Sequence, residues 1–172
     1  DRSSAASDVY KRQTIFNPAP AVEFPDSVYP LCDYFTPNET EAADLAGIPV
    51  TSVDEAREAA KIFRDRGVKT ALITLGEMGC YFMNESGEGH VPAFDMSGKV
   101  VETTGAGDGF NGGFAAALAE GKSPDEAIRY GSATAAISVT RLGTAPAMPQ
   151  RSEIEHLVNC LLYTSDAADE RS

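Results

Sequence analysis

The 172-residue sequence contains only three cysteines and two histidines, and no two cysteines form a C-x-x-C pair. A structural zinc site or a disulfide framework depends on such clusters, so the sequence disfavours both. Sparse, unpaired cysteine is typical of the reducing cytoplasm, and we expect a cytoplasmic protein. No apolar run approaches the ~20 residues that a membrane-spanning helix needs, so we expect no membrane partner.

Basic residues are also scarce, because 14 Lys and Arg stand against 26 Asp and Glu, for a net charge of −12. Proteins that bind the phosphate backbone of nucleic acids need clustered Lys and Arg, so we expect no nucleic-acid partner. A nucleotide site is not excluded, since backbone N–H groups and one Mg²⁺ can hold phosphates. The length and the apolar fraction of 42% are sufficient for one domain, or a large piece of one.

The two ends of the chain are interpreted as translated sequencing-library adapter. Residues 3–13 (SSAASDVYKRQ) can be encoded by a DNA string whose reverse complement, in another frame, encodes residues 160–170 (CLLYTSDAADE). Unrelated ends of one gene would almost never be complementary over this length, and the string is similar to a transposase adapter. We therefore expect adapter-derived tails at residues 1–13 and 160–172 around an insert at residues 14–159. A natural N-terminal arm and C-terminal helix are the alternative.

Strands and helices alternate along the insert, which predicts a layered α/β domain. Short strands are expected at residues 14–16, 33–35, 68–75 and 80–83, with a hairpin turn at 85–89 and a return at 90–93. The nearly continuous apolar run 68–75 is typical of a strand covered on both faces in a parallel sheet. Helices are expected at residues 39–46, 52–66, 108–119 and 124–138, and a last one is expected to begin at Ser152.

The segment Glu102–Asn111 (ETTGAGDGFN) carries the candidate chemistry. Gly105, Ala106 and Gly107 stand immediately before a helix, where their backbone N–H groups can form a concave phosphate site that the helix dipole strengthens. Asp108 then lies in the first helical turn, where a carboxylate can take a proton from a hydroxyl that attacks phosphorus. From spacing alone, an ordinary loop with an N-capping Asp is an equal alternative.

The run GAGDGFNGG resembles the signature of the ribokinase (PfkB) family of carbohydrate kinases, and FNPAP, TPNETEA, LITLGEMG, GEGHVPAF and AISVTRLGTAPAMP match in family order. The resemblance implies a ribokinase-like layered sheet with helices on both faces, of which residues 14–159 form a partial kinase domain without the N-terminal half and lid. It implies an ATP-dependent sugar kinase, and TPNETEA and GEGHVPAF look most like members that convert D-ribose to D-ribose 5-phosphate. Fructose, 2-keto-3-deoxygluconate and nucleoside kinases remain alternatives, as does a non-catalytic nucleotide- or sugar-binding module.

The resemblance also implies roles for residues that match the family's motifs. Asp108 matches the catalytic base, and Gly105, Ala106 and Gly107 match the anion hole for the γ-phosphoryl group. Asn38 and Glu41 match the N-x-x-E motif, in which the Glu acts on Mg²⁺ indirectly. From the residues alone, an ordinary N-cap followed by a surface Glu is the alternative. The expected nucleotide contacts are Asn38, Thr74, Leu75, Gly76, Glu77, Met78, Gly79, Gly107, Asp108 and Ser132. The expected K⁺ ligands are Glu102, Thr104, Ser138, Arg141, Gly143 and Ala147.

Two of these positions depart from the family's usual residues: Glu102 stands for the more usual Asp and Ala147 for the more usual Ser. Ser132 likewise stands where many relatives carry an Asn or His near the adenine. The family's residues for the small-molecule sugar lie mainly upstream of this segment, so we expect the 172-residue chain itself to be inactive. The resemblance leaves open whether the parent enzyme forms a homodimer.

Overall fold

The computed structural model describes residues 12–169, and the side chains of residues 12–160. These residues belong to two compact units. The first unit runs to Leu75 and includes Cys80–His90, and the second comprises Gly76–Gly79 and the chain from Val91 onward. Most of the expected N-terminal adapter tail and the last three residues lie outside the described residues, so the interpretation of the ends stays a prediction.

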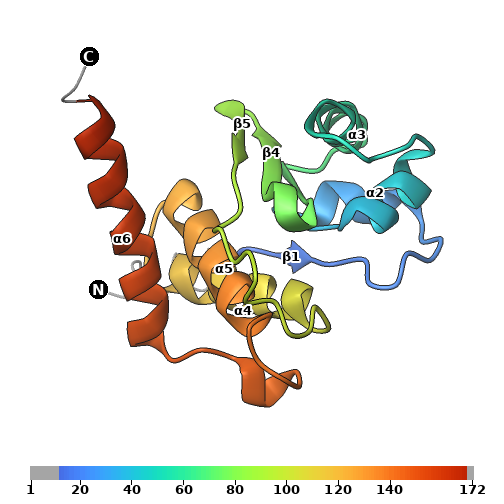
Figure 1. Cartoon of the computed structure of the whole chain (residues 1–172). Coiled ribbons are helices and arrows are strands. Elements are labelled where there is room, and N and C mark those ends of the chain that lie inside the picture. Colours follow the sequence, from blue (N-terminus) through green and yellow to red (C-terminus); the bar gives the residue numbers. More distant parts are fainter. Residues whose placement is uncertain (1–11, 170–172) are drawn as a thin grey trace, which may run out of the picture. The chain divides into compact units, whose positions relative to one another are not determined.

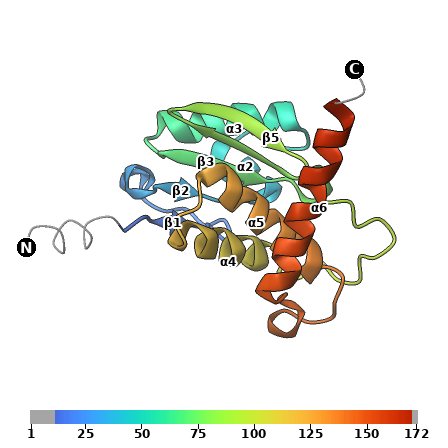
Figure 2. The same ribbon diagram turned by 90° about the vertical axis from the view of Figure 1, so that its left-hand side faces the viewer.

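The first unit is built on a mixed five-stranded sheet in the order β1-β2-β3-β4-β5. Figure 1 labels β1, β4 and β5, and Figure 2 labels β2 and β3. The strands β1 (Ile15–Phe16), β2 (Tyr34–Phe35) and β3 (Thr70–Thr74) are parallel, and β4 (Cys80–Asn84) is antiparallel to β3. The last strand, β5 (Gly87–Val91), begins inside the expected 85–89 turn. The turn is shorter than predicted because the Asn84 side chain accepts hydrogen bonds from the amides of Ser86 and Gly87.

The helices α2 (Glu39–Ala46) and α3 (Val53–Asp65) pack against each other and against β3 (Figure 2). A 3₁₀ turn, η1 (Asp26–Leu31), precedes β2. The apolar residues Ala56, Ala59, Ala60 and Phe63 of α3 are fully buried, and the rings of Phe63 and Phe35 lie 4.9 Å apart in this core. Ser52 with Glu55 three residues later predicts a capping box at the start of α3. Ser52 caps the helix, but Glu55 does not close the box, because its carboxylate accepts from the amide and hydroxyl of Thr51 instead.

The second unit contains the paired helices α4 (Ala106–Ala119) and α5 (Pro124–Ser138), followed by α6 (Arg151–Asp169). Two short 3₁₀ turns, η2 (Gly76–Met78) and η3 (Ala145–Ala147), belong to this unit. Glycines allow α4 and α5 to approach closely, since a Cβ on Gly113 would lie 2.2 Å from Thr134 Oγ1. The start of α6 was predicted wrongly: it begins at Arg151, because the amide of Gln150 is capped by the Glu153 carboxylate.

Side chains outside the candidate site divide into buried and exposed ones. Cys32 and Cys80 are buried, whereas His90 and His156 are exposed. On α4, Phe110, Phe114 and Ala117 are buried, and Leu118 is half-buried. Within the described residues, no helix is both long and apolar enough to cross a bilayer.

Candidate active site

The start of α4 leaves backbone amides in front of its first hydrogen-bonded turn. Gly105 adopts a left-handed conformation (φ +82°), which a residue with a side chain rarely takes, and so turns the chain into the helix. The helical ladder begins with the amide of Gly109, which donates to the Gly105 carbonyl at 2.8 Å. The amides of Gly107 and Asp108 precede this ladder, whereas that of Ala106 donates to the Thr103 carbonyl at 3.1 Å.

The backbone at the start of α4 is accessible from outside, and the carboxylate of Asp108 lies next to it. Asp108 is exposed in the first turn of α4. A Cβ on Gly107 would meet nothing within 4 Å, whereas a Cβ on Gly105 would lie 3.0 Å from the Thr144 side chain. The loop is therefore packed on the Thr144 side and accessible on the Gly107 side. An anion that approached Gly107 would meet backbone N–H groups and the positive end of the helix dipole.

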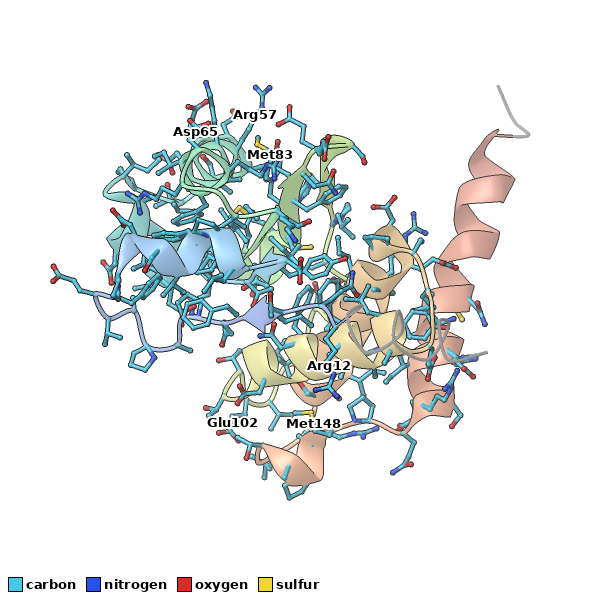
Figure 3. The ribbon with its side chains drawn as sticks, turned by 180° about the vertical axis from the view of Figure 1, so that it is seen from behind. Arg12, Arg57, Asp65, Met83, Glu102 and Met148 are labelled. Atoms are coloured by element: carbon cyan, nitrogen blue, oxygen red, sulfur yellow. The ribbon has the colours of Figure 1, made fainter. Side chains whose placement is uncertain are left out.

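Glu102 joins this loop to the turn that follows α5. Its carboxylate accepts a hydrogen bond from the Gly143 amide at 3.0 Å and another from the Thr104 hydroxyl. These bonds stabilise the charged form and hold the pKa of Glu102 below its usual value. The backbone takes part as well, since the amides of Val101 and Glu102 both donate to the Val139 carbonyl. Glu102 and Met148 lie at the same end of α4 in Figure 3.

The residues expected to bind K⁺ belong to the segments gathered around the start of α4. Ser138 is buried near Gly109, where a Cβ would lie 3.4 Å from the Ser138 hydroxyl. The Arg141 side chain, which pairs with Glu153, is itself a cation without acceptor atoms, so only the backbone carbonyl of Arg141 could bind a cation. A hard monovalent cation prefers oxygen ligands, and the Glu102 carboxylate and the backbone carbonyl groups of these segments are oxygen donors. The composition of the site therefore fits K⁺.

Asn38 and Glu41 form a complete capping box at the start of α2. The Asn38 side chain accepts from the Glu41 amide, and the Glu41 carboxylate accepts from the Asn38 amide, both at 2.9 Å. Glu41 is only 7% exposed, while Asn38 is exposed. Asn38 also pairs with Thr74 in a parallel bridge, so the N-x-x-E pair lies beside the end of β3. The pair is thus a rigid part of the carboxyl edge of the parallel strands, where α/β sheets bind ligands.

Mg²⁺ commonly uses one or two carboxylates, keeps several waters and takes its other ligands from substrate phosphates. A single buried carboxylate at a strand edge is compatible with that mode, and Glu41 is of this kind. Among the described residues, no group of three or more His, Cys, Asp or Glu side chains could hold a metal ion by itself. Glu41, as a single buried carboxylate, fits a metal ion that takes its other ligands from phosphate and water.

The loop expected to contact the nucleotide is divided between the two units. Leu75 is buried at the end of β3, whereas Gly76, Glu77 and Met78 are exposed in η2. Gly79 has a φ of +93°, and a Cβ there would lie 2.1 Å from the Val91 carbonyl oxygen. Only glycine fits this close approach. Ser132 is half-buried on α5.

The structure thus gathers the candidate residues into two groups. One group, at the strand ends of the first unit, contains Asn38, Glu41, Thr74 and Leu75. The other belongs to the second unit, where the segments carrying Glu102 through Asp108 meet those carrying Ser138 through Ala147. Sequence reasoning overlooked Asn17, whose side-chain amide donates to the Thr36 carbonyl at 2.6 Å. Its signal is a polar residue placed directly after a short apolar strand.

Comparison with known proteins identifies the family. The model of the pfkB family of carbohydrate kinases matches residues 5–151. The chain belongs to this family. Its match covers α4 and the Gly-Ala-Gly-Asp segment as well as the strands of the first unit. The expected ribokinase-like α/β fold is confirmed.

Individual members of the pfkB family are similar over most of this chain. Ribokinase from Haemophilus influenzae is 45% identical over 141 residues, which are 82% of this chain and 45% of that protein. Deoxyribokinase from Salmonella typhi is 40% identical over 138 residues, or 80% of this chain and 44% of that protein. The chain therefore spans about half the length of the curated relatives it matches.

Solved structures give the same fold. Ribokinase from Thermotoga maritima superposes with a TM-score of 0.78 at 39% identity, covering 91% of this chain and 52% of that one. Arabidopsis thaliana ribokinase, solved in complex with ribose and ATP, superposes with a TM-score of 0.79 at 31% identity. That match covers 85% of this chain and 47% of the Arabidopsis chain.

Proposed function

We propose that the full-length protein to which residues 14–159 belong transfers the γ-phosphoryl group of ATP to a hydroxyl group of D-ribose, giving D-ribose 5-phosphate. The observation that carries the proposal is the exposed Asp108 beside the open Gly107 face at the start of α4. Membership of the pfkB family and similarity to several proteins named ribokinase support it. The solved complex of Arabidopsis ribokinase with ribose and ATP supports the choice of both substrates.

In this proposal, Asp108 acts as the general base. Its carboxylate accepts the proton of the sugar hydroxyl, whose oxygen then attacks the γ-phosphorus in line with the departing ADP. Negative charge on the transferring group is stabilised by the amides of Gly107 and Asp108 and by the dipole of α4. We call the amides of Gly107 and Asp108 the phosphate cradle. The Ala106 amide donates to the Thr103 carbonyl in this structure, so it could bind the transferring group together with them only after that hydrogen bond breaks.

Two cations complete the proposal. Mg²⁺ supplies charge neutralisation on the ATP phosphates when bound. Asn38 and Glu41 would position it from the start of α2, with Glu41 acting indirectly. K⁺ would be held by Glu102 and the carbonyl groups of residues 104, 138, 141 and 143, with Ala147 beside them, and so would support the anion loop. The adenosine part of ATP would contact residues 74–79 and Ser132.

A second acceptor, deoxyribose, is favoured by one observation. The Salmonella typhi relative at 40% identity is named deoxyribokinase. The two sugars differ by one hydroxyl group, and enzymes discriminate such pairs by hydrogen bonds that only one substrate can make. A small sugar is the partner in either case, and the phosphoryl-transfer chemistry at Asp108 is the same.

The test is ADP formation by the full-length protein over a panel of D-ribose, deoxyribose, fructose, 2-keto-3-deoxygluconate and a nucleoside, each with and without K⁺. We expect ribose-dependent ADP formation that increases with K⁺. If turnover were fastest on another sugar, that sugar and not D-ribose would be the substrate of this kinase. ATP binding without sugar-dependent ADP formation on any acceptor would identify a binding module instead.

A further inference from the structure

Asn17 occupies the place where the ladder between β1 and β2 loses a backbone donor. The amides of Tyr34 and Thr36 donate to the carbonyl groups of Thr14 and Phe16, both at 2.9 Å. In the alternation of a parallel ladder, the next bond would run from the amide of residue 18 to the carbonyl of Thr36. Residue 18 is proline, which has no N–H group. The Asn17 side chain donates to the Thr36 carbonyl instead, at 2.6 Å.

The hydrogen bond from Asn17 holds residues 36–38, and the last of these, Asn38, is the first residue of the N-x-x-E pair. Thr36 is 2% exposed and Pro37 is fully buried. On the side away from β1, the Pro37 carbonyl accepts from the Thr74 amide at 3.0 Å. The Asn38 amide then donates to Glu41 at 2.9 Å. The segment is thus fixed from β1 by Asn17, from β3 by Thr74 and from α2 by Glu41.

We propose that Asn17 is a positioning residue for the Mg²⁺ and phosphate side of the reaction, acting through the Thr36 carbonyl on Asn38 and Glu41. This inference rests on the proposed function, because it assumes that the N-x-x-E pair serves Mg²⁺ and ATP. The side chain need not touch either one. It replaces the missing ladder bond, so that the start of α2 keeps one position relative to β1 and β3.

The first experiment compares Asn17→Asp with Asn84→Asp in the 172-residue chain. Both substitutions add one negative charge to the first unit. At residue 17 the aspartate loses the donor and turns an anionic oxygen toward the Thr36 carbonyl. At residue 84 the aspartate can keep the native hydrogen bonds, because Asn84 uses its side-chain oxygen as an acceptor from the amides of Ser86 and Gly87. Asn17→Ala serves as a second variant that loses the donor without adding charge.

The measured quantity is ATP affinity by calorimetry, with and without Mg²⁺. We expect both Asn17 variants to reduce the Mg²⁺-dependent gain in affinity by about three- to tenfold, the effect of one hydrogen bond. Metal-free ATP affinity should stay that of the wild type, and Asn84→Asp should leave both affinities unchanged. An unchanged Mg²⁺ gain in Asn17→Ala would overturn the proposal. So would an equal loss of affinity with and without Mg²⁺, which indicates a merely structural role.

A second measurement, without ligand, separates this proposal from the proposed function. Amide hydrogen exchange should become faster at Asn38 and Glu41 in both Asn17 variants, and stay unchanged at Ser86 and Gly87. Absence of Mg²⁺-dependent ATP binding in the wild-type chain would count against the proposed function. In that event unchanged exchange at Asn38 and Glu41 would refute the positioning role of Asn17, and faster exchange there would support it.

Discussion

The carboxylate of Glu102 accepts a hydrogen bond from the Gly143 amide at 3.0 Å, although the two residues are 41 positions apart in the sequence. Its charge is stabilised further by the Thr104 hydroxyl. One ionised side chain therefore holds together the loop before α4 and the turn after α5. The same two segments carry the proposed anion cradle and K⁺ ligands, so the stability of this end of α4 depends on the protonation state of Glu102.

We expect Glu102→Gln to lower the thermal midpoint of the chain at pH 7, because a neutral amide is a weaker acceptor than a carboxylate. The folded pKa of Glu102 lies below the ordinary value of 4.5. Its contribution is therefore fully present above about pH 4.5 and is lost as pH falls through the folded pKa. The thermal midpoints of wild type and variant should therefore become equal at acid pH. Glu58→Gln, on the exposed face of α3, is the control, and an equal difference at pH 7 and pH 3 would contradict the role given to Glu102.

Neighbouring glycines on α4 give a matched test of the α4–α5 contact. A Cβ on Gly113 would lie 2.2 Å from Thr134 Oγ1 and 3.0 Å from the Tyr130 carbonyl, whereas a Cβ on Gly112 would meet nothing within 4 Å. Gly113→Ala should lower the free energy of unfolding by roughly 1–3 kcal/mol through overpacking. Gly112→Ala should raise it by up to about 1 kcal/mol through helix propensity. Urea unfolding measures both, and equal stability of the two variants would show that the close approach is wrong.

Gly107 provides a test of the phosphate cradle that does not depend on loss of fold. The space at its Cβ position is open, so Gly107→Ala should fold normally. The added methyl group would occupy the surface that a phosphate needs to reach the backbone. We expect ATP affinity to fall roughly ten- to a hundredfold, the effect of losing a hydrogen bond to a charged group. Calorimetry with Gly112→Ala as control measures this, and wild-type affinity in Gly107→Ala would place the phosphates elsewhere.

The two roles of Asn38 can be separated by substitution. Asn38→Ala should lower the free energy of unfolding by about 0.5–2 kcal/mol, because the α2 cap is lost. Asn38→Ser keeps a capping oxygen and should retain most of that stability. Neither variant has the amide group, so both should bind Mg²⁺·ATP more weakly. If Asn38→Ser bound Mg²⁺·ATP like the wild type, Asn38 would be a helix cap and no more.

The sequence predicted elements well where local chemistry decides them. The bounds of α2 and α5 agree with prediction because each helix has a complete capping box, at Asn38 and Ser123. Predictions failed where one carboxylate had several possible donors. Glu55 bonds Thr51 instead of closing the Ser52 box, and Glu153 caps Gln150, so that Ser152 lies inside α6.

Tertiary contacts explain what sequence reasoning did not find at the site. The Gly-Ala-Gly-Asp segment could be named as a candidate because glycines before a helix permit a phosphate nest, although spacing alone left an ordinary capped loop equally open. The bond from Glu102 to Gly143 depends on how α4 and α5 pack, and no local pattern encodes it. Asn17 is similar, since its hydrogen bond to Thr36 could be expected only once β1 and β2 are aligned and Pro18 is found to lack the needed donor.

The role of Asp108 as the base that activates the sugar hydroxyl is tested most sharply by Asp108→Asn in the full-length protein. The measurement is ribose-dependent ADP formation under saturating ATP, with ATP affinity determined in parallel. We expect kcat to fall by about 10²–10⁴ while ATP affinity stays that of the wild type. Wild-type turnover by this variant, with ATP still bound, would show that Asp108 is not the base.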